Sequence, residues 1–178
     1  RHTHPAADAL QQALRDNKLT EADVERVVAH VHQGAIDVLG PVVNPQTVHQ
    51  SKFSMGTVLA LIARQGRAGL AESDAGLDDP AVAAFRGKVE MELDPEVDAA
   101  YPQRWIGKVT VYTRDGRKLH GRVDEPKGDP GNTLSRAELA DKFQRLSQFS
   151  GARTPAQANA LIEKVWNLRN ATSMAHWL

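Results

Sequence analysis

The feature that most constrains the fold is residues 106–124, which read IGKVTVYTRDGRKLHGRVD. Apolar and polar residues alternate on both sides of Asp115 and Gly116, a dipeptide typical of hairpin turns in which the backbone needs positive φ. The pattern predicts two antiparallel strands joined at this dipeptide. Any fold of this chain must therefore include a sheet.

Helix signals precede this hairpin at three places. Residues 3–19 begin with a candidate cap at Thr3 and carry apolar residues at the spacing of one helical face. A second helix begins at Ser54, read as its N-cap, and ends at Gly66. A short third helix has Asp79 as cap and Gly87 just past its end.

Two further segments predict strands. Residues 88–93, KVEMEL, alternate apolar and polar side chains. Residues 25–39 are rich in valine with near alternation, which favours a strand, although Val24, Val27, Val28 and Val31 also fit the helical period. With the hairpin, these segments bring the expected number of strands to about four.

Two helices are expected at the C-terminal end. Ser135 and Glu138 have the spacing of a capping box, and Leu139, Phe143 and Leu146 follow on one face. A last helix opens at residues 154–155 and is expected to turn its apolar side chains inward, namely Ala158, Leu161, Ile162 and Val165. The fold class is therefore α+β, a two-layer sandwich of helices on a mainly antiparallel sheet, followed by C-terminal helices.

Composition excludes several classes of protein. The 178 residues are 41% apolar and 25% charged, which is enough to bury a core. Lysine plus arginine equal aspartate plus glutamate at 22 each, so the basic surface of a nucleic-acid-binding protein is not expected. No apolar run approaches a membrane span and no signal peptide is evident, so a soluble, cytoplasmic protein is expected.

The chain contains no cysteine, which excludes disulfides and thiolate metal sites. Any chemistry must use oxygen and nitrogen groups. The sequence opens on Arg1 without a methionine, directly at the edge of a motif, and we interpret it as a fragment or a processed piece.

One candidate anion site lies at residues 51–56, which read SKFSMG. Lys52 stands just before the helix that begins after Ser54, and the free N–H groups of a helix N-terminus attract carboxylate or phosphate. The alternative is that Ser54 only caps the helix while Lys52 is solvated. The local pattern alone favours that alternative.

Histidines occur twice with one residue between them, at His2 and His4 and at His30 and His32. Side chains two apart on a strand share a face and could chelate a metal if carboxylates joined them. No further ligand has a diagnostic spacing, so we expect structural or surface roles for His30 and His32 and no metal site. His4, in the first turn of a helix beside Arg1 and His2, is the better candidate for binding an anion.

The remaining titratable residues form no convincing acid–base pair. The carboxylates at Asp78 and Asp79, and at Asp124 and Glu125, are interpreted as caps and solubilising groups at strand ends. Ordinary surface or packing roles are expected for the other histidines, which are His49, His120 and His176.

Four segments of the chain resemble motifs of the MmgE/PrpD family. RHTHPAADAL is similar to the end of the family segment K-P-Y-x-x-C-R-x-T-H-P-A-I-D-A, and KFSMGTVLALIARQG is similar to its helix K-F-S-L-x-Y-x-L-A-x-A-L-x-x-G. WIGKVTVYTRDGRKL resembles its hairpin, and PKGDPGNTLSRAELADKF resembles its crossing P-K-G-x-P-x-N-P-L-S-x-x-E-L-x-x-K-F. The four segments occur in the family order and cover nearly the whole chain.

The resemblance implies an architecture. Members of the family have a large helical domain, formed by the N-terminal part and the last helices, with an α+β lid inserted between them. Residues 1–130 would then be the lid-like domain, and residues 131–178 would be helices that pack on an N-terminal helical domain. Lys127, in the crossing between the two, would lie near bound substrate in the cleft; a solvated loop charge is the alternative.

The resemblance also implies a chemistry. The family comprises 2-methylcitrate dehydratases of propionate metabolism, cis-aconitate decarboxylases and relatives such as an iminodisuccinate epimerase. The expected reaction is a proton transfer on a di- or tricarboxylate, without metal or cofactor, in a homodimer. Lys52 and Ser54 would bind the substrate carboxylate with Lys127, Met55 would line the pocket, and His4 would belong to the acid–base set.

Departures from the family pattern leave a second hypothesis open. Gly56 and Thr57 replace the usual aromatic neighbourhood, and Thr133 replaces the proline that follows Asn132. The family's lysine and its following histidine or cysteine lie upstream of Arg1, so activity of this segment alone is not expected. The alternative is a stand-alone, non-catalytic binding or interaction module with the same fold.

Overall fold

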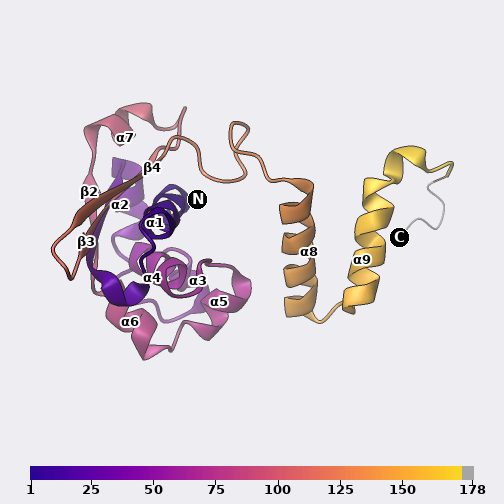
Figure 1. Cartoon of the computed structure of the whole chain (residues 1–178), viewed down its shortest axis with the longest axis horizontal. Coiled ribbons are helices and arrows are strands. Elements are labelled where there is room, and N and C mark those ends of the chain that lie inside the picture. Colours follow the sequence, from indigo (N-terminus) through magenta and orange to yellow (C-terminus); the bar gives the residue numbers. More distant parts are fainter. Residues whose placement is uncertain (174–178) are drawn as a thin grey trace. The chain divides into compact units, whose positions relative to one another are not determined.

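The computed structural model describes residues 1–173, which divide into two compact units (Figure 1). Unit 1 is Arg1–Thr133, and unit 2 begins at Leu134. The strands of unit 1 are β1 (Val24–Val31), β2 (Val89–Leu93), β3 (Gly107–Thr113) and β4 (Lys118–Val123). Its helices are α1 (His4–Asp16), α2 (Gln33–Leu39), α3 (Val48–Ser51), α4 (Met55–Gln65), α5 (Leu70–Ala75), α6 (Pro80–Arg86) and α7 (Pro95–Ala100), with a 3₁₀ turn, η1 (Glu21–Asp23).

The four strands form one mixed sheet in the order β2-β1-β3-β4. β1 pairs with β3 and β3 with β4 in antiparallel fashion, while β1 and β2 are parallel. In the register, Ala29 lies between Met91 on β2 and Val109 on β3. The predicted α+β class and mainly antiparallel sheet are confirmed, and the ambiguous valine-rich segment is a strand followed by the short helix α2.

The predicted hairpin is confirmed, with a different turn. Thr113 N donates to Arg117 O at 3.0 Å and Gly116 N donates to Thr113 O at 2.9 Å, so three residues form the loop. Gly116 has φ of 86°, whereas Asp115 does not have positive φ. This is the three-residue hairpin in which a left-handed glycine follows a tight turn, so only one residue of the dipeptide needs positive φ.

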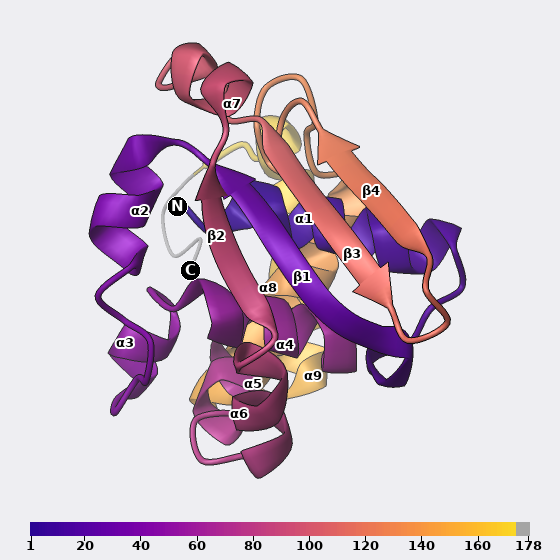
Figure 2. The same ribbon diagram turned by 90° about the vertical axis from the view of Figure 1, so that its left-hand side faces the viewer.

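The core lies between the sheet and the helices α1 and α4, which cover the same face (Figure 2). Leu10, Leu59 and Val111 are completely buried there. Two strand glycines allow α1 to approach closely, because a Cβ at Gly107 would lie 2.0 Å from Pro5 O and one at Gly121 would lie 2.1 Å from Ala9 O. The sheet therefore holds the first half of α1 in a fixed position.

The predicted helix boundaries are largely confirmed in unit 1. Ser54 caps α4 by accepting a hydrogen bond from Thr57 N, and Gly66 ends that helix with φ of 71°. Asp79 caps α6 through Ala81 N. Thr3 occupies the N-cap position of α1, but its side chain makes no capping hydrogen bond.

Unit 2 consists of α8 (Arg136–Ser150), α9 (Pro155–Trp166) and a 3₁₀ turn, η2 (Leu168–Asn170). The capping box of Ser135 and Glu138 is confirmed, and Thr154 caps α9 through Gln157 N. Gln144 Nε2 donates to Asn159 Oδ1 at 2.5 Å between the two helices.

The expectation that α9 turns its apolar residues inward holds only in part. Ala158 is buried, but Val165 is 45% exposed, because α8 covers only part of its apolar face. On α8, Leu139 and Leu146 are also exposed. The sequence prediction for His176 lies outside the described residues. Within residues 1–173, no helix combines the length and the apolar character that crossing a membrane requires.

Candidate functional site

The first candidate site is the start of α4. The backbone at Ser54 is extended, with φ of −100° and ψ of 110°, and the helix begins at Met55. Ser54 Oγ lies 3.3 Å from Thr57 N and 3.1 Å from Thr57 Oγ1. When Thr57 donates both hydrogen bonds, the Ser54 hydroxyl still has its own proton to donate to a ligand.

A cavity of about 90 Å³ opens at this helix start, and we call it the α4 pocket. Ser54, Met55 and Gly56 line it from α4, while Arg86 and Met91 line it from α6 and β2. The first turn of any helix has N–H groups without intrahelical partners, and their partial positive charge attracts anions. The pocket thus has a helix N-terminus, a serine and an arginine in its lining.

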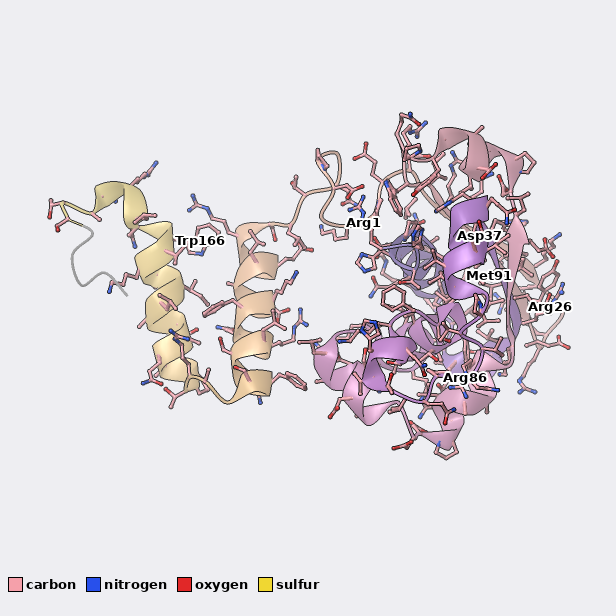
Figure 3. All side chains as sticks on the ribbon, turned by 180° about the vertical axis from the view of Figure 1, so that it is seen from behind. Arg1, Arg26, Asp37, Arg86, Met91 and Trp166 are labelled. Carbon is pink, nitrogen blue, oxygen red and sulfur yellow. The ribbon has the colours of Figure 1, made fainter. Side chains whose placement is uncertain are left out.

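Arg86 was not predicted from the sequence. It is the last residue of α6, and Arg86 and Met91 lie on the same side of unit 1 (Figure 3). Its Nη2 donates to Asn44 Oδ1 at 3.4 Å, a long hydrogen bond that a carboxylate can replace. A Cβ at Gly56 would lie 2.7 Å from Arg86 Cγ and 3.0 Å from Arg86 O, so the glycine allows α6 to lie against the start of α4.

Lys52 precedes α4 in the chain, at the C-cap of the short helix α3. Its side chain is exposed and forms no ion pair within the part of the chain that the structure describes. Met55, by contrast, is buried and lines the α4 pocket. Ser54 caps α4, as the alternative to an anion site predicted, and it also lines the pocket.

The predicted residues His4 and Lys127 lie at a second place, where the crossing segment contacts α1. Lys127 N donates to Asp8 Oδ2 at 2.5 Å, and Arg1 Nη2 donates to Asp129 Oδ2 at 2.7 Å. The Arg1 hydrogen bond holds the pKa of Asp129 below its usual range, and the charge of His4 lowers this pKa further. His4 and the crossing are therefore neighbours, and the side chains of His4 and Lys127 are both exposed.

The histidine pairs do not form the chelating arrangement that their spacing allows. His30 Nε2 lies 2.8 Å from Thr110 Oγ1, whereas His32 follows the strand and stacks on Tyr101 with ring centroids 3.8 Å apart. Within residues 1–173, no group of three or more histidine, aspartate or glutamate side chains is placed to hold a metal ion.

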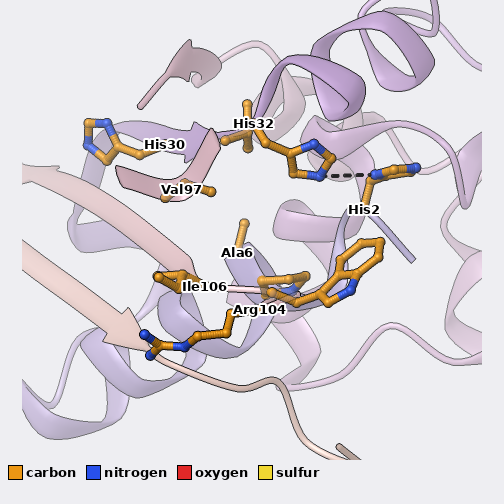
Figure 4. A pocket seen from close by; sticks show the side chains of 10 residues that line it. His2, Ala6, His30, His32, Val97, Arg104 and Ile106 are labelled. Carbon is orange, nitrogen blue, oxygen red and sulfur yellow. Dashed lines mark hydrogen bonds between the residues drawn. The ribbon is translucent and has the colours of Figure 1, made fainter. Parts of the chain in front are cut away.

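His32 instead contacts His2, its Nε2 lying 3.2 Å from His2 Nδ1 (Figure 4). Burial lowers the pKa of both imidazoles. A pocket beside them, bounded by Trp105 and Arg104, has a cavity volume of about 10 Å³. That is room for about one water molecule, so it is not a preformed substrate site.

Comparison with known protein families gives one result. Residues 1–168 match the model of the MmgE/PrpD C-terminal domain. No curated protein matches the chain.

Proposed function

Because the chain belongs to the MmgE/PrpD family, we propose that it is the C-terminal part of a metal-independent lyase or isomerase that acts on di- or tricarboxylates. The family includes 2-methylcitrate dehydratase, and the reaction would be a dehydration, a decarboxylation or an epimerisation of such an acid. The groups in the α4 pocket would bind a substrate carboxylate. Turnover would further require groups from the helical domain that the family resemblance implies.

The observation that carries this proposal is the α4 pocket. Arg86 lies at its wall, and within residues 1–173 its guanidinium makes only one hydrogen bond, a long one to Asn44. A planar guanidinium binds a carboxylate through two parallel hydrogen bonds, and the N–H groups at the start of α4 supply further donors. An acidic metabolite therefore fits this pocket better than a neutral or cationic ligand does.

Lyase and isomerase reactions on such acids share one electrostatic requirement. Removal of a proton next to a carboxylate places additional negative charge on that carboxylate in the transition state. Cationic side chains and helix N-termini aimed at it therefore stabilise the transition state more than the ground state. Lys52, Ser54 and Arg86 would serve this purpose, with Met55 as the apolar wall.

His4 and Lys127 would complete the site from α1 and the crossing. A histidine can transfer protons near neutral pH, and a lysine can hold a second carboxylate. Their common neighbourhood around Asp129 supports a joint role for them. In this proposal His4 belongs to the acid–base set and Lys127 binds substrate.

A second candidate function is a non-catalytic module that binds carboxylates without turnover. The exposed positions of His4 and Lys127 favour it, because acid–base groups are usually shielded from bulk water. Thr57, at the place where relatives are expected to carry an aromatic side chain, favours it as well.

The two functions are separated by assaying the complete gene product against 2-methylcitrate, citrate, cis-aconitate and iminodisuccinate with a chelator present. Turnover of one acid that persists in chelator supports the lyase or isomerase, and loss of turnover in chelator contradicts a metal-independent reaction. Saturable binding without any turnover supports the binding module.

Arg86→Gln tests the pocket itself. We expect it to weaken carboxylate binding by about tenfold, since hydrogen bonds to charged groups contribute roughly 1.5–3 kcal/mol and this site is partly solvated. The matched control is Arg26→Gln, because Arg26 pairs with Glu90 and does not line the α4 pocket. Equal effects of the two substitutions would contradict the role of Arg86.

A further inference from the structure

Within residues 1–173, His32 is a buried imidazole with a hydrogen-bond partner at only one of its two nitrogens. The residue is 6% exposed and stacks on Tyr101 with an interplanar angle of 8°. Its Nε2 lies 3.2 Å from His2 Nδ1, while its buried Nδ1 has no partner within residues 1–173. The sequence predicts a structural or surface role for His32, and the proposed function does not use it.

This asymmetry determines where the proton of neutral His32 lies. A neutral imidazole has one N–H donor and one acceptor nitrogen. A proton on Nδ1 would bury an N–H without an acceptor, which native proteins rarely tolerate. The proton therefore lies on Nε2, and His32 donates a hydrogen bond to Nδ1 of His2.

The tautomer of His2 follows from that of His32. Because His2 Nδ1 accepts the hydrogen bond, the proton of neutral His2 lies on Nε2, the ring nitrogen on the side away from His32 (Figure 4). A second proton could bind His2 only at Nδ1, and His32 would then have to move its own proton to the buried, partnerless Nδ1. His32 thus opposes the protonation of His2.

The charged groups around the pair act in both directions. Arg1 lies 4.9 Å from the centre of the Trp105 ring beside His2, and Arg104 lines the adjacent pocket. Burial, and then the charge of His2, lowers the pKa of His32, whereas Asp98 on α7 raises it. The N-terminal ammonium lowers the pKa of both rings. Since burial is the largest of these effects, the neutral form of both rings is favoured at neutral pH.

We propose that His32 is a positioning residue that holds His2 as a neutral imidazole, so that His2 presents its Nε2–H as a fixed hydrogen-bond donor to a carboxylate oxygen of the substrate. The ligand class rests on the proposed function, whereas the tautomers rest on the geometry of the pair. A neutral donor strengthens its hydrogen bond as negative charge accumulates on the oxygen, without transferring a proton. His2 would thus be a neutral hydrogen-bond donor near the start of α1, whereas the neighbouring His4 would transfer protons.

The test is a long-range ¹H–¹⁵N correlation spectrum of the histidine rings in the ¹⁵N-labelled chain. We expect the Nε2–H tautomer for both His2 and His32 and a titration midpoint of His2 below the ordinary value of about 6.5. The proposal is overturned if His32 carries its proton on Nδ1, or if His2 is an imidazolium at neutral pH. This measurement needs neither turnover nor a variant.

Two variants test the positioning role. His32→Phe keeps a ring against Tyr101 but removes the donor, so the tautomers of His2 should become mixed and its midpoint should rise. His32→Gln retains an N–H donor, so His2 should remain largely in its neutral Nε2–H tautomer, as in the parent. His30→Gln is the matched control, because His30 contacts Thr110 on the neighbouring strand. If His2 keeps the tautomer and the titration midpoint of the parent in His32→Phe, the positioning role is wrong.

Citrate tests the ligand role separately. Added citrate should shift the Nε2–H signal of His2 and leave that of the exposed His49 unchanged. If citrate perturbs the α4 pocket but not His2, the donor role of His2 is wrong while the proposed function stands. If citrate binds nowhere on the chain, the proposed function fails, and the tautomer result alone decides whether His32 positions His2.

Discussion

Glu96 lies between two cations at the end of the sheet. Lys108 Nζ on β3 is 2.5 Å from its Oε2, and Arg122 Nη2 on β4 is 2.7 Å from its Oε1. The hydrogen bonds from Arg122 and then Lys108 lower the pKa of Glu96 from 4.5 to about 2. Asp94, which also contacts Lys108, has a lowered pKa as well.

These shifts predict how stability depends on pH. A carboxylate with a lower pKa in the folded state stabilises the fold above its unfolded pKa, and this contribution is lost as pH falls through the folded pKa. The free energy of unfolding should therefore decrease between about pH 4.5 and 2, as measured by urea unfolding. Glu96→Gln should flatten this decrease. The same pH profile in Glu96→Gln and in the parent would contradict the account.

At the scale of single residues, the sequence identifies roles that depend on near neighbours. The capping role of Ser54 was predictable because its partner, Thr57, is three residues away. Arg86 and His32 were missed, since their contacts with Asn44 and His2 join parts of the chain 42 and 30 residues apart. The isolated arginine before Gly87 and the histidine after the valine run carry no local signal of those contacts.

The start of α4 is the element on which the candidate site depends, and its cap can be tested separately from its ligand. Ser54→Ala removes the hydrogen bond to Thr57 N and should lower the free energy of unfolding by about 1 kcal/mol. Ser54→Gly should cost only a few tenths of a kcal/mol, because glycine is an acceptable N-cap. Urea denaturation measures both. If alanine is no more destabilising than glycine, the hydroxyl does not cap α4.

The approach of α1 to the sheet gives a second prediction for an element. A Cβ at Gly121 would lie 2.1 Å from Ala9 O, so Gly121→Ala must displace α1 and should destabilise the fold by about 3 kcal/mol. Gly87→Ala is the matched control, because its Cβ would meet no atom closer than 3.6 Å and should change stability by less than about 0.5 kcal/mol. Similar thermal unfolding of both variants would show that α1 does not pack as described.

Elements were predictable where their signals are local. The hairpin of β3 and β4, the caps of α6 and α8 and the glycine that ends α4 all follow from residues within a few positions. The parallel pairing of β1 with β2 could not be predicted, because about 60 residues separate the two strands and only burial in the folded core selects it. The α4 pocket depends on that pairing, since Met91 and Val89 of β2 line it.

At the scale of the whole molecule, unit 2 leaves apolar side chains exposed. Leu146 is 39% exposed and Phe149 is 48% exposed on α8, and Val165 is 45% exposed on α9. Exposed apolar side chains that gather on such helices favour association with a partner. We propose that in the complete protein these helices pack on the helical domain expected from the family.

The isolated chain should therefore self-associate. Light scattering at increasing concentration is expected to show dimers or larger species, and the double substitution of Leu146→Gln with Phe149→Gln should shift the distribution toward monomer. The matched control replaces two exposed residues of α9, Glu163 and Lys164, with glutamine. A monomer at all concentrations would contradict this expectation.

The proposed function depends most on the binding of an acidic metabolite at the start of α4. Its most direct test is a titration of the ¹⁵N-labelled chain with citrate, followed through the backbone amide signals. We predict saturable shifts at Met55, Gly56 and Thr57. The affinity for citrate obtained from them should fall about tenfold in Arg86→Gln and stay the same in Arg26→Gln. The absence of shifts at these amides would contradict binding at this site. So would equal shifts in the parent, Arg86→Gln and Arg26→Gln when a neutral analogue replaces citrate.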